Sequence, residues 1–207
     1  MKTLTKEMQT AISPTMALGL LKEGNKRFVN NSKINRNLLQ QANETSNGQH
    51  PFAVILSCID SRTSAELIFD QGLGDVFSVR VAGNIVNEDI LGSMEFGCKV
   101  AGAKIIVVLG HTKCGAIKGA CDNVELGNLT GLISKIKPAV DQEMSTTKNR
   151  DSSNSNFVEN VAELNVSLSV KNILLKSPII AEMVKNDTIG IVGGVHDIST
   201  GEVKFFE

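Results

Sequence analysis

The sequence predicts an α/β fold in which a mostly parallel central sheet of four strands, plus a short C-terminal edge strand, is flanked by helices and preceded by an N-terminal helical arm. Two observations predict this class. Almost wholly apolar runs, such as residues 52–57 and 104–110, are typical of strands buried on both faces of a parallel sheet. Segments with helical spacing separate successive strands, as the crossovers of such a sheet require.

The length of 207 residues fits one domain over residues 1–207. We expect residues 1–48 to form the arm and residues 49–207 the α/β core. Ser13 and Pro14 are typical of a helix start, with Ser13 as the N-cap and Pro14 at the first helical position. An apolar stripe on this helix is formed by Met16, Leu20, Leu21 and Phe28.

Residues 30–48 are rich in Asn, Gln and Ser and carry few apolar side chains. Because such a segment buries little apolar surface by itself, we expect it to lie against a partner subunit.

The first half of the core alternates strands and helices. In order, the expected elements are a strand at 52–57, a helix at 64–71, a strand at 76–82, a helix at 88–101 and a strand at 104–110. Gly72 and Gly102 end the two helices, since glycine readily adopts the left-handed conformation of a helix end.

The second half of the core contains more helix. The expected elements are a helix from residue 115 to 120, a helix at 129–144 broken or bent near Pro138, a loop at 145–156, a helix at 157–175 and strands at 188–197 and 203–206. Because ligands of such sheets bind at the carboxyl ends of the strands, the residues that follow each strand are the candidates for function.

Charge and composition exclude several classes of partner. The 21 basic and 22 acidic residues nearly cancel, and Trp and Tyr are absent, so we expect neither a nucleic acid nor a membrane partner. No apolar stretch is long enough to cross a bilayer, and the first ten residues do not resemble a signal peptide. Four scattered cysteines do not form a disulfide framework. We therefore expect a cytoplasmic protein with reduced thiols.

Polar and sulfur-containing side chains follow two of the apolar runs. Cys58, Asp60 and Arg62 come directly after the first strand, and His111 and Cys114 follow the third. Two strands that end side by side would bring two thiols and an imidazole together.

Thiolate sulfur and imidazole nitrogen are the ligands that zinc prefers, so Cys58, His111 and Cys114 predict a zinc site. Three protein ligands leave a fourth position open, as in catalytic zinc sites. The alternative is that the two cysteines are ordinary core residues and His111 a satisfied polar group. Each residue alone favours that alternative, but three together at strand ends favour the metal. Cys98 and Cys121 are expected to pack on helices as small apolar residues.

Asp60 and Arg62 stand two residues apart, so their side chains can pair. The alternative interpretation is a surface ion pair of little energetic value. Beside a metal the pair matters more, because Asp60 could itself occupy the fourth coordination position and Arg62 would hold it off. We expect both states to be reachable by this sequence.

Together with residues 79–84, these two motifs resemble the β-class carbonic anhydrases of bacterial type, and the similarity runs in good order from residue 49 to 120. The resemblance implies that Cys58, His111 and Cys114 are the zinc ligands and that Asp60 and Arg62 are a catalytic dyad. It further implies that the substrate pocket is lined by Gln49, Phe77 and Phe96.

The activity implied is that of a lyase: zinc-dependent reversible hydration of carbon dioxide to bicarbonate and a proton, by zinc-bound hydroxide that the dyad orients. The resemblance also implies one Zn²⁺ per subunit and a homodimer, or a dimer of dimers, built with swapped N-terminal helices. Two alternatives stay open: a hydrolase of carbon disulfide or carbonyl sulfide on the same fold, and a non-catalytic zinc-binding protein. His50 and His196 are candidates for the proton carrier by residue type only.

Overall fold

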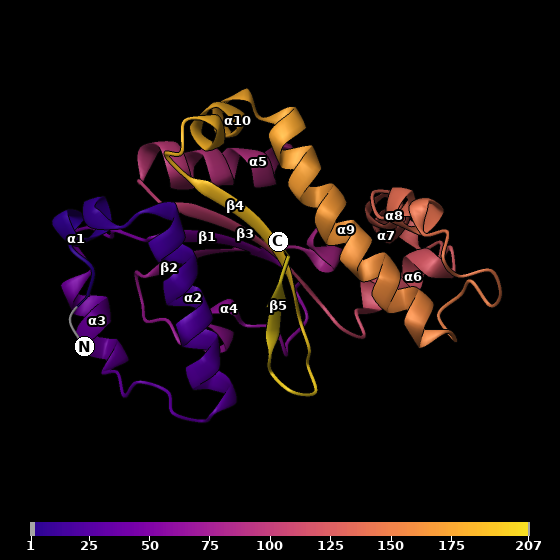
Figure 1. The fold of residues 1–207 in the computed structure, drawn as a ribbon, viewed down its shortest axis with the longest axis horizontal. Helices are drawn as coiled ribbons and strands as arrows, with labels where there is room; N and C mark the ends of the chain where they lie inside the picture. Colours follow the sequence, from indigo (N-terminus) through magenta and orange to yellow (C-terminus); the bar gives the residue numbers. More distant parts are fainter. Residues whose placement is uncertain (1–2, 207) are drawn as a thin grey trace.

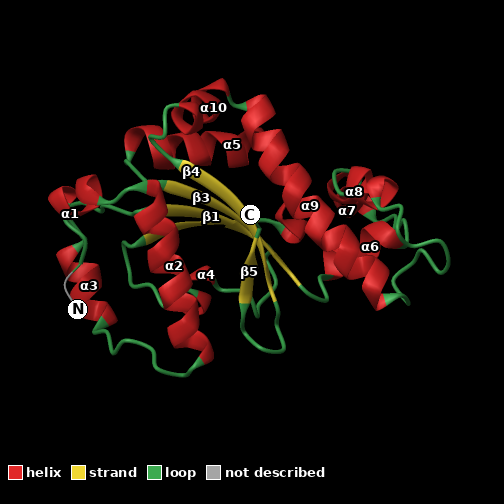
Figure 2. Ribbon diagram, in the orientation of Figure 1, coloured by secondary structure: helices red, strands yellow, loops and turns green. Residues whose placement is uncertain are grey.

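A five-stranded sheet organises the computed structural model, which describes residues 3–206 (Figure 1, Figure 2). Its strands are β1 (Ala53–Ser57), β2 (Val76–Arg80), β3 (Ile105–His111), β4 (Gly190–His196) and β5 (Val203–Phe205). In the order β2-β1-β3-β4-β5, the first four strands run parallel and β5 pairs antiparallel with β4. This arrangement confirms the predicted fold class of four parallel strands and a short C-terminal edge strand.

The apolar runs that predicted strands lie at the centre of the sheet. Every residue of β1 and β3 is buried, as expected for strands covered on both faces. In contrast, β2 is an edge strand, and its residues are only partly buried or exposed. The two central strands therefore form the rigid part of the molecule, and β2 lies at its margin.

Helices cover both faces of the sheet. One face packs against α5 (Glu88–Glu95), a π-helical turn (Phe96–Val100), α9 (Ser155–Lys176) and α10 (Pro178–Lys185), which Figure 1 shows along the upper side. The other face packs against α2 (Pro14–Val29) and α4 (Ala65–Ile68). A third apolar cluster joins α6 (Gly115–Cys121), α7 (Gly127–Ile133) and α8 (Lys137–Gln142) to the first half of α9.

The predicted helical segment over residues 129–144 is broken near Pro138, which is one of the two outcomes expected there. The structure has two helices there, α7 and α8, separated by residues 134–136. Pro138 lies in the first turn of α8, where its fixed φ suits a helix start and its missing N–H costs nothing. The proline therefore lies at the start of a second helix, so that of the two expected outcomes the structure has the break.

Three helices have no counterpart among the predicted elements. They are α1 (Lys6–Ala11), α3 (Leu38–Glu44) and α10, each of eight residues or fewer. Each has a polar N-cap side chain that accepts a hydrogen bond from the first turn. The capping residues identify these starts, but the helices are too short for their apolar spacing to be distinctive.

The arm is fastened to its own core through Asp70. The Asp70 carboxylate, 2% exposed, accepts a hydrogen bond from Arg27 Nε at 2.5 Å, another from the buried Arg36 guanidinium and a third from the Ile34 backbone at 3.2 Å. Burial alone would raise the pKa of this carboxyl, but the hydrogen bonds from Arg27 and Arg36 outweigh burial and hold it below its usual range. The polar segment after α2 is thus held by charge where apolar contacts are few.

We predict that Asp70→Asn lowers the free energy of unfolding by about 3 kcal/mol, because it leaves buried guanidinium groups without a charged partner. Urea unfolding at neutral pH measures the change. A group whose pKa is depressed by folding stabilises the protein above its unfolded-state pKa and loses this effect on acidification. The difference in unfolding free energy between wild type and Asp70→Asn should therefore become smaller below about pH 4.

Glu23→Gln is the matched control, since it removes an exposed carboxylate that pairs with Lys26 on the same arm. That variant should change the unfolding free energy by no more than about 0.5 kcal/mol. If Asp70→Asn and Glu23→Gln lowered the free energy of unfolding equally, a special role for Asp70 would be contradicted.

Candidate active site

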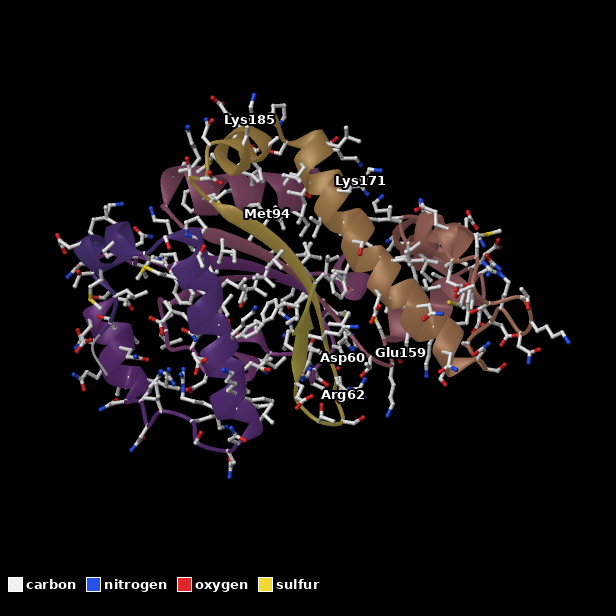
Figure 3. All side chains as sticks on the ribbon, in the orientation of Figure 1. Asp60, Arg62, Met94, Glu159, Lys171 and Lys185 are labelled. Atoms are coloured by element: carbon white, nitrogen blue, oxygen red, sulfur yellow. The ribbon has the colours of Figure 1, made fainter. Side chains whose placement is uncertain are left out.

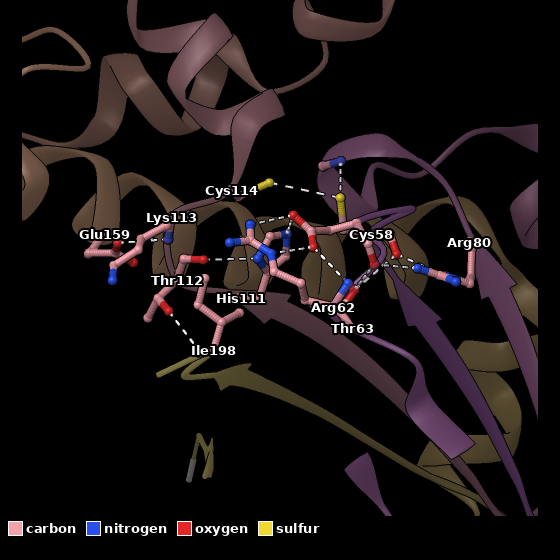
Figure 4. Close-up of polar contacts among 12 residues, drawn as sticks. Cys58, Arg62, Thr63, Arg80, His111, Thr112, Lys113, Cys114, Glu159 and Ile198 are labelled. Atoms are coloured by element: carbon pink, nitrogen blue, oxygen red, sulfur yellow. Dashed lines mark hydrogen bonds and ion pairs between the residues drawn. The ribbon is translucent and has the colours of Figure 1, made fainter. Parts of the chain in front are cut away.

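The parallel pairing of β1 with β3 brings the two motifs together. Ser57, the last residue of β1, pairs with Leu109 of β3, so Cys58 and His111 emerge at the same edge of the sheet. Cys114 is the N-cap of α6, three residues beyond His111. In the turn between them Lys113 has a φ of 57°, and its N–H donates to Glu159 Oε1 at 2.9 Å (Figure 4). This turn directs Cys114 back toward Cys58.

The structure brings the three predicted metal-ligating residues together. Ligand atoms of Cys58, His111 and Cys114 all lie within 4.8 Å of one another, and all three residues are buried. The two Sγ atoms are 3.9 Å apart, and the Gly83 N–H donates to Cys58 Sγ at 3.4 Å. Gly83 has a φ of 68°, in the left-handed region that favours glycine. The backbone thus comes close to the sulfur where a side chain would not fit.

The imidazole of His111 is held in the orientation that a metal ligand needs. Its Nδ1 lies 2.9 Å from the Thr112 carbonyl oxygen, and donation to that oxygen leaves the Nε2 lone pair free. Nε2 is buried and has no hydrogen-bond partner among the described residues. An orphaned imidazole nitrogen beside two thiols matches the donor set of Zn²⁺, so these residues fit the implied metal.

Of the two thiols, Cys58 loses its proton easily, and Cys114 keeps its proton in the contact between the two sulfurs. A hydrogen bond from Cys114 lowers the pKa of Cys58 to about 4, against the effect of its burial. The same contact raises the pKa of Cys114, because its proton is held against the Cys58 thiolate. One thiolate is therefore present at neutral pH, and binding of a metal would release the second proton.

Asp60 and Arg62 form the predicted pair at the border of this cluster (Figure 3, Figure 4). Arg62 Nε donates to Asp60 Oδ1 at 2.9 Å and Nη2 donates to Oδ2 at 2.7 Å. The Arg62 backbone N–H also donates to Oδ1, at 3.0 Å, as is common where Asp begins a turn. These contacts, led by the Arg62 side chain, hold the pKa of Asp60 well below its usual range. Asp60 Oδ2 is 3.9 Å from His111 Nε2, so the pair lies beside the ligands.

Two side chains that support this turn were not predicted. Arg80, the last residue of β2, donates from Nε to the Cys58 carbonyl at 3.0 Å and from Nη2 to the Asp60 carbonyl at 2.6 Å. Thr63 Oγ1 donates to the same two carbonyls, at 3.3 and 2.9 Å. The presence of Arg80 in the motif at residues 79–84 was a signal, but sequence alone did not indicate which strand β1 would pair with.

The predicted pocket residues do not meet the metal ligands within one chain. Phe77 pairs with Val54, four residues before Cys58 on β1, or about 13 Å along the strand. The ring centroids of Phe77 and Phe96 are 6.2 Å apart, and Phe96 is 54% exposed. Gln49 is exposed and precedes β1, at the other end of the strand from Cys58. Phe77 and Phe96 line a groove along the β2 edge that reaches Arg80.

The remaining histidines and cysteines lie apart from the ligand cluster or deep in the protein. His196 is buried opposite His111 in the β3–β4 register, and burial is the main reason that its pKa falls to about 4. His50 lies before β1, at the far end of the strand. Burial raises the pKa of Cys98 to about 12 and that of Cys121 to about 11, as expected for packed thiols. Among the described residues no helix has the length and apolarity to cross a membrane.

Comparison with known proteins gives a consistent family. The family model described as carbonic anhydrase matches residues 53–203. Carbonic anhydrase 2 of Mycobacterium tuberculosis is 34% identical over 195 residues, which cover 91% of each chain. The carbonic anhydrase of Mycolicibacterium smegmatis is 32% identical over 194 residues, which cover 93% of each chain.

Solved structures agree with this assignment. The β-carbonic anhydrase CafA of Aspergillus fumigatus superposes with a TM-score of 0.72 at 25% identity, covering 93% of this chain and 90% of that one. A β-carbonic anhydrase from Sordaria macrospora, described as tetrameric, gives a TM-score of 0.71 at 26% identity, covering 79% and 84%. The chain therefore belongs to the β-class carbonic anhydrases, and it is a lyase of that family.

Proposed function

We propose that this protein catalyses the reversible hydration of carbon dioxide to bicarbonate and a proton, with one Zn²⁺ per subunit held by Cys58, His111 and Cys114. The observation that carries the proposal is the buried cluster of two thiols and one orphaned imidazole nitrogen at the carboxyl ends of β1 and β3. When bound, zinc would lower the pKa of a water that it holds to about 7 and so supply a nucleophile near neutrality.

Each protein ligand has a distinct task in this proposal. Cys58 would bind a metal as a thiolate, because its pKa is already low, and Cys114 would have to give up its proton to bind it. His111 keeps its Nδ1 proton on the Thr112 carbonyl and presents Nε2. Three protein donors leave one position of a tetrahedral site for water and substrate.

Asp60 and Arg62 control that remaining position. Paired with Arg62, the Asp60 carboxylate can accept a hydrogen bond from water and orient it toward carbon dioxide. A carboxylate that left Arg62 would be close enough to His111 Nε2 to compete for the metal. We propose that the paired arrangement seen here is the one that permits hydration and that the alternative closes the site.

We further propose that a second copy of the chain supplies the substrate pocket. Gln49, Phe77 and Phe96 lie away from the metal ligands of their own chain, yet both rings belong to a groove on the open edge of β2. Apolar rings suit carbon dioxide, and a glutamine amide can donate to one of its oxygens. A homodimer joined near this edge would bring one chain's rings toward the other chain's metal.

The two alternative functions have less support. All the relatives described above are named carbonic anhydrases, which favours carbon dioxide over carbon disulfide or carbonyl sulfide as substrate. The Asp60–Arg62 pair favours catalysis over a closed, non-catalytic zinc site.

Loss of one metal ligand tests the central proposal. We expect Cys58→Ser to bind less than one Zn²⁺ per chain and to lose carbon dioxide hydration in a stopped-flow assay. Cys98→Ala is the matched control, because Cys98 is a buried cysteine that packs in a different apolar cluster from Cys58. It should keep both zinc and activity per folded chain. Wild-type protein with bound zinc that hydrates carbon dioxide no faster than buffer would refute the proposed activity.

The dyad is tested by the pH dependence of the rate. Since Arg62 keeps the pKa of Asp60 well below its usual range, Asp60 stays ionised over the assay range of about pH 6 to 9. Asp60→Asn should therefore lower kcat about 10- to 100-fold at every pH. The rate should still rise with pH, and the midpoint of that rise, near pH 7, should shift by less than about one pH unit. Asp187→Asn, an exposed change in a turn that asparagine tolerates, should behave as wild type. If Asp60→Asn removed the pH dependence, Asp60 itself would be the titrating group.

Mixed dimers test whether the pocket comes from the partner. One chain carries Cys58→Ser, the other carries Phe77→Ala and Phe96→Ala, and different affinity tags isolate the mixed dimer. A pocket supplied by the partner leaves one of the two sites intact, so about half of the wild-type activity should return. If each chain supplied its own pocket, the mixed dimer would have no more than half the activity of the double alanine variant.

A further inference from the structure

The turn that carries Asp60 is fastened from outside by one arginine. Arg80 reaches from the end of β2 to two carbonyls of this turn, those of Cys58 and Asp60, at 3.0 and 2.6 Å (Figure 4). Its guanidinium thus binds backbone on both sides of Ile59. Among the described residues, no other side chain from outside the turn forms a hydrogen bond with the Asp60 backbone.

The other bonds of the turn move with it. Thr63 donates to the same two carbonyls, and Arg62 donates to the Asp60 carboxylate, but both residues belong to the turn itself. A rotation of the whole turn could preserve those contacts. Arg80 is different, because β2 is held in register by five residue pairs with β1. It therefore fixes the turn relative to the sheet.

The position of the Asp60 carboxylate makes this anchor matter. Its Oδ2 lies 3.9 Å from His111 Nε2, the atom that faces the metal site. The side chain of Arg62 is 53% exposed, so water competes for its half of the ion pair. A small displacement of the turn would thus be enough to bring the carboxylate to the metal.

We propose that Arg80 is a positioning residue which, by binding the Cys58 and Asp60 carbonyls, keeps the Asp60 carboxylate turned toward Arg62 and off the metal. The inference rests on the metal centre proposed above. Arg80 touches neither substrate nor metal in this role; it acts through Asp60. Its removal should consequently matter only while residue 60 is a carboxylate.

Anion binding to the cobalt-substituted protein tests the positioning role of Arg80 independently of catalytic activity. Azide occupies an open coordination position and changes the visible spectrum of Co²⁺, so its dissociation constant reports whether that position is accessible. In Arg80→Gln we expect azide binding to weaken at least about tenfold, as for other groups that orient the surroundings of a metal. Lys171→Gln, which removes an exposed positive charge on the outer face of α9, should bind azide as wild type does (Figure 3).

The double variant Arg80→Gln/Asp60→Asn separates positioning from a general structural effect. We expect it to regain the azide affinity of Asp60→Asn alone, because no carboxylate remains to compete. Unchanged azide binding in Arg80→Gln, or a double variant as weak as Arg80→Gln, would overturn the assignment. If Arg80→Gln does not take up one Co²⁺ per chain, Arg80→Lys is measured in its place. We expect a smaller loss of azide affinity in that variant, and a wild-type azide affinity would contradict the proposal. Wild-type protein that bound no Co²⁺ would instead refute the metal centre itself.

Discussion

The hydrogen-bonded pairing of β1 with β3 is the constraint on which the candidate site depends. Cys58 and Cys114 are separated by 56 residues in sequence, and their sulfurs are 3.9 Å apart because these two parallel strands end at one edge. Both strands are wholly buried, so their register is fixed by packing on two faces. A shift of either strand by one residue would exchange its side chains between the two packed faces and separate Cys58 from His111. The packing that stabilises the core therefore also brings the three candidate metal ligands together.

The meeting of Cys58, His111 and Cys114 and the pairing of Asp60 with Arg62 could be predicted because each motif is short and lies next to a distinctive apolar strand. Local chemistry and strand-end topology were sufficient to place them together. The position of Phe77 and Phe96 could not be predicted in this way, since it depends on which strand forms the edge of the sheet and which way its rings face. The sequence left open whether the helical segment bends or breaks near Pro138, because a proline bends one helix or starts another depending on the tertiary contacts of the preceding turn.

Ion pairs hold two segments of this fold that have few apolar contacts. Residues 30–37 bury little, yet the segment is held because Asp70 collects Arg27, Arg36 and the Ile34 N–H. A comparable ion-pair cluster lies after α8, where the buried Glu143 carboxylate accepts a hydrogen bond from Arg150 at 2.9 Å. The Arg150 guanidinium also lies 4.7 Å from the centre of the Phe157 ring. Sequence composition alone predicted a segment lying against a partner subunit in the first place and a loop in the second, because composition does not show which charged side chains will pair.

The edge strand β2 has a consequence beyond the support of one turn. Its inner side is bonded to β1, its outer side has no strand partner within the described chain, and its last residue binds the Cys58 and Asp60 carbonyls. Anything that docked along the outer side and shifted the equilibrium position of β2 would alter the energy of the Asp60 carboxylate, because Arg80 at the end of β2 binds the turn that carries Asp60. Thermodynamic linkage makes the coupling mutual, so occupancy of the metal site would alter the affinity of that edge for its partner. Assembly and catalysis would then be linked functions of a single five-residue strand.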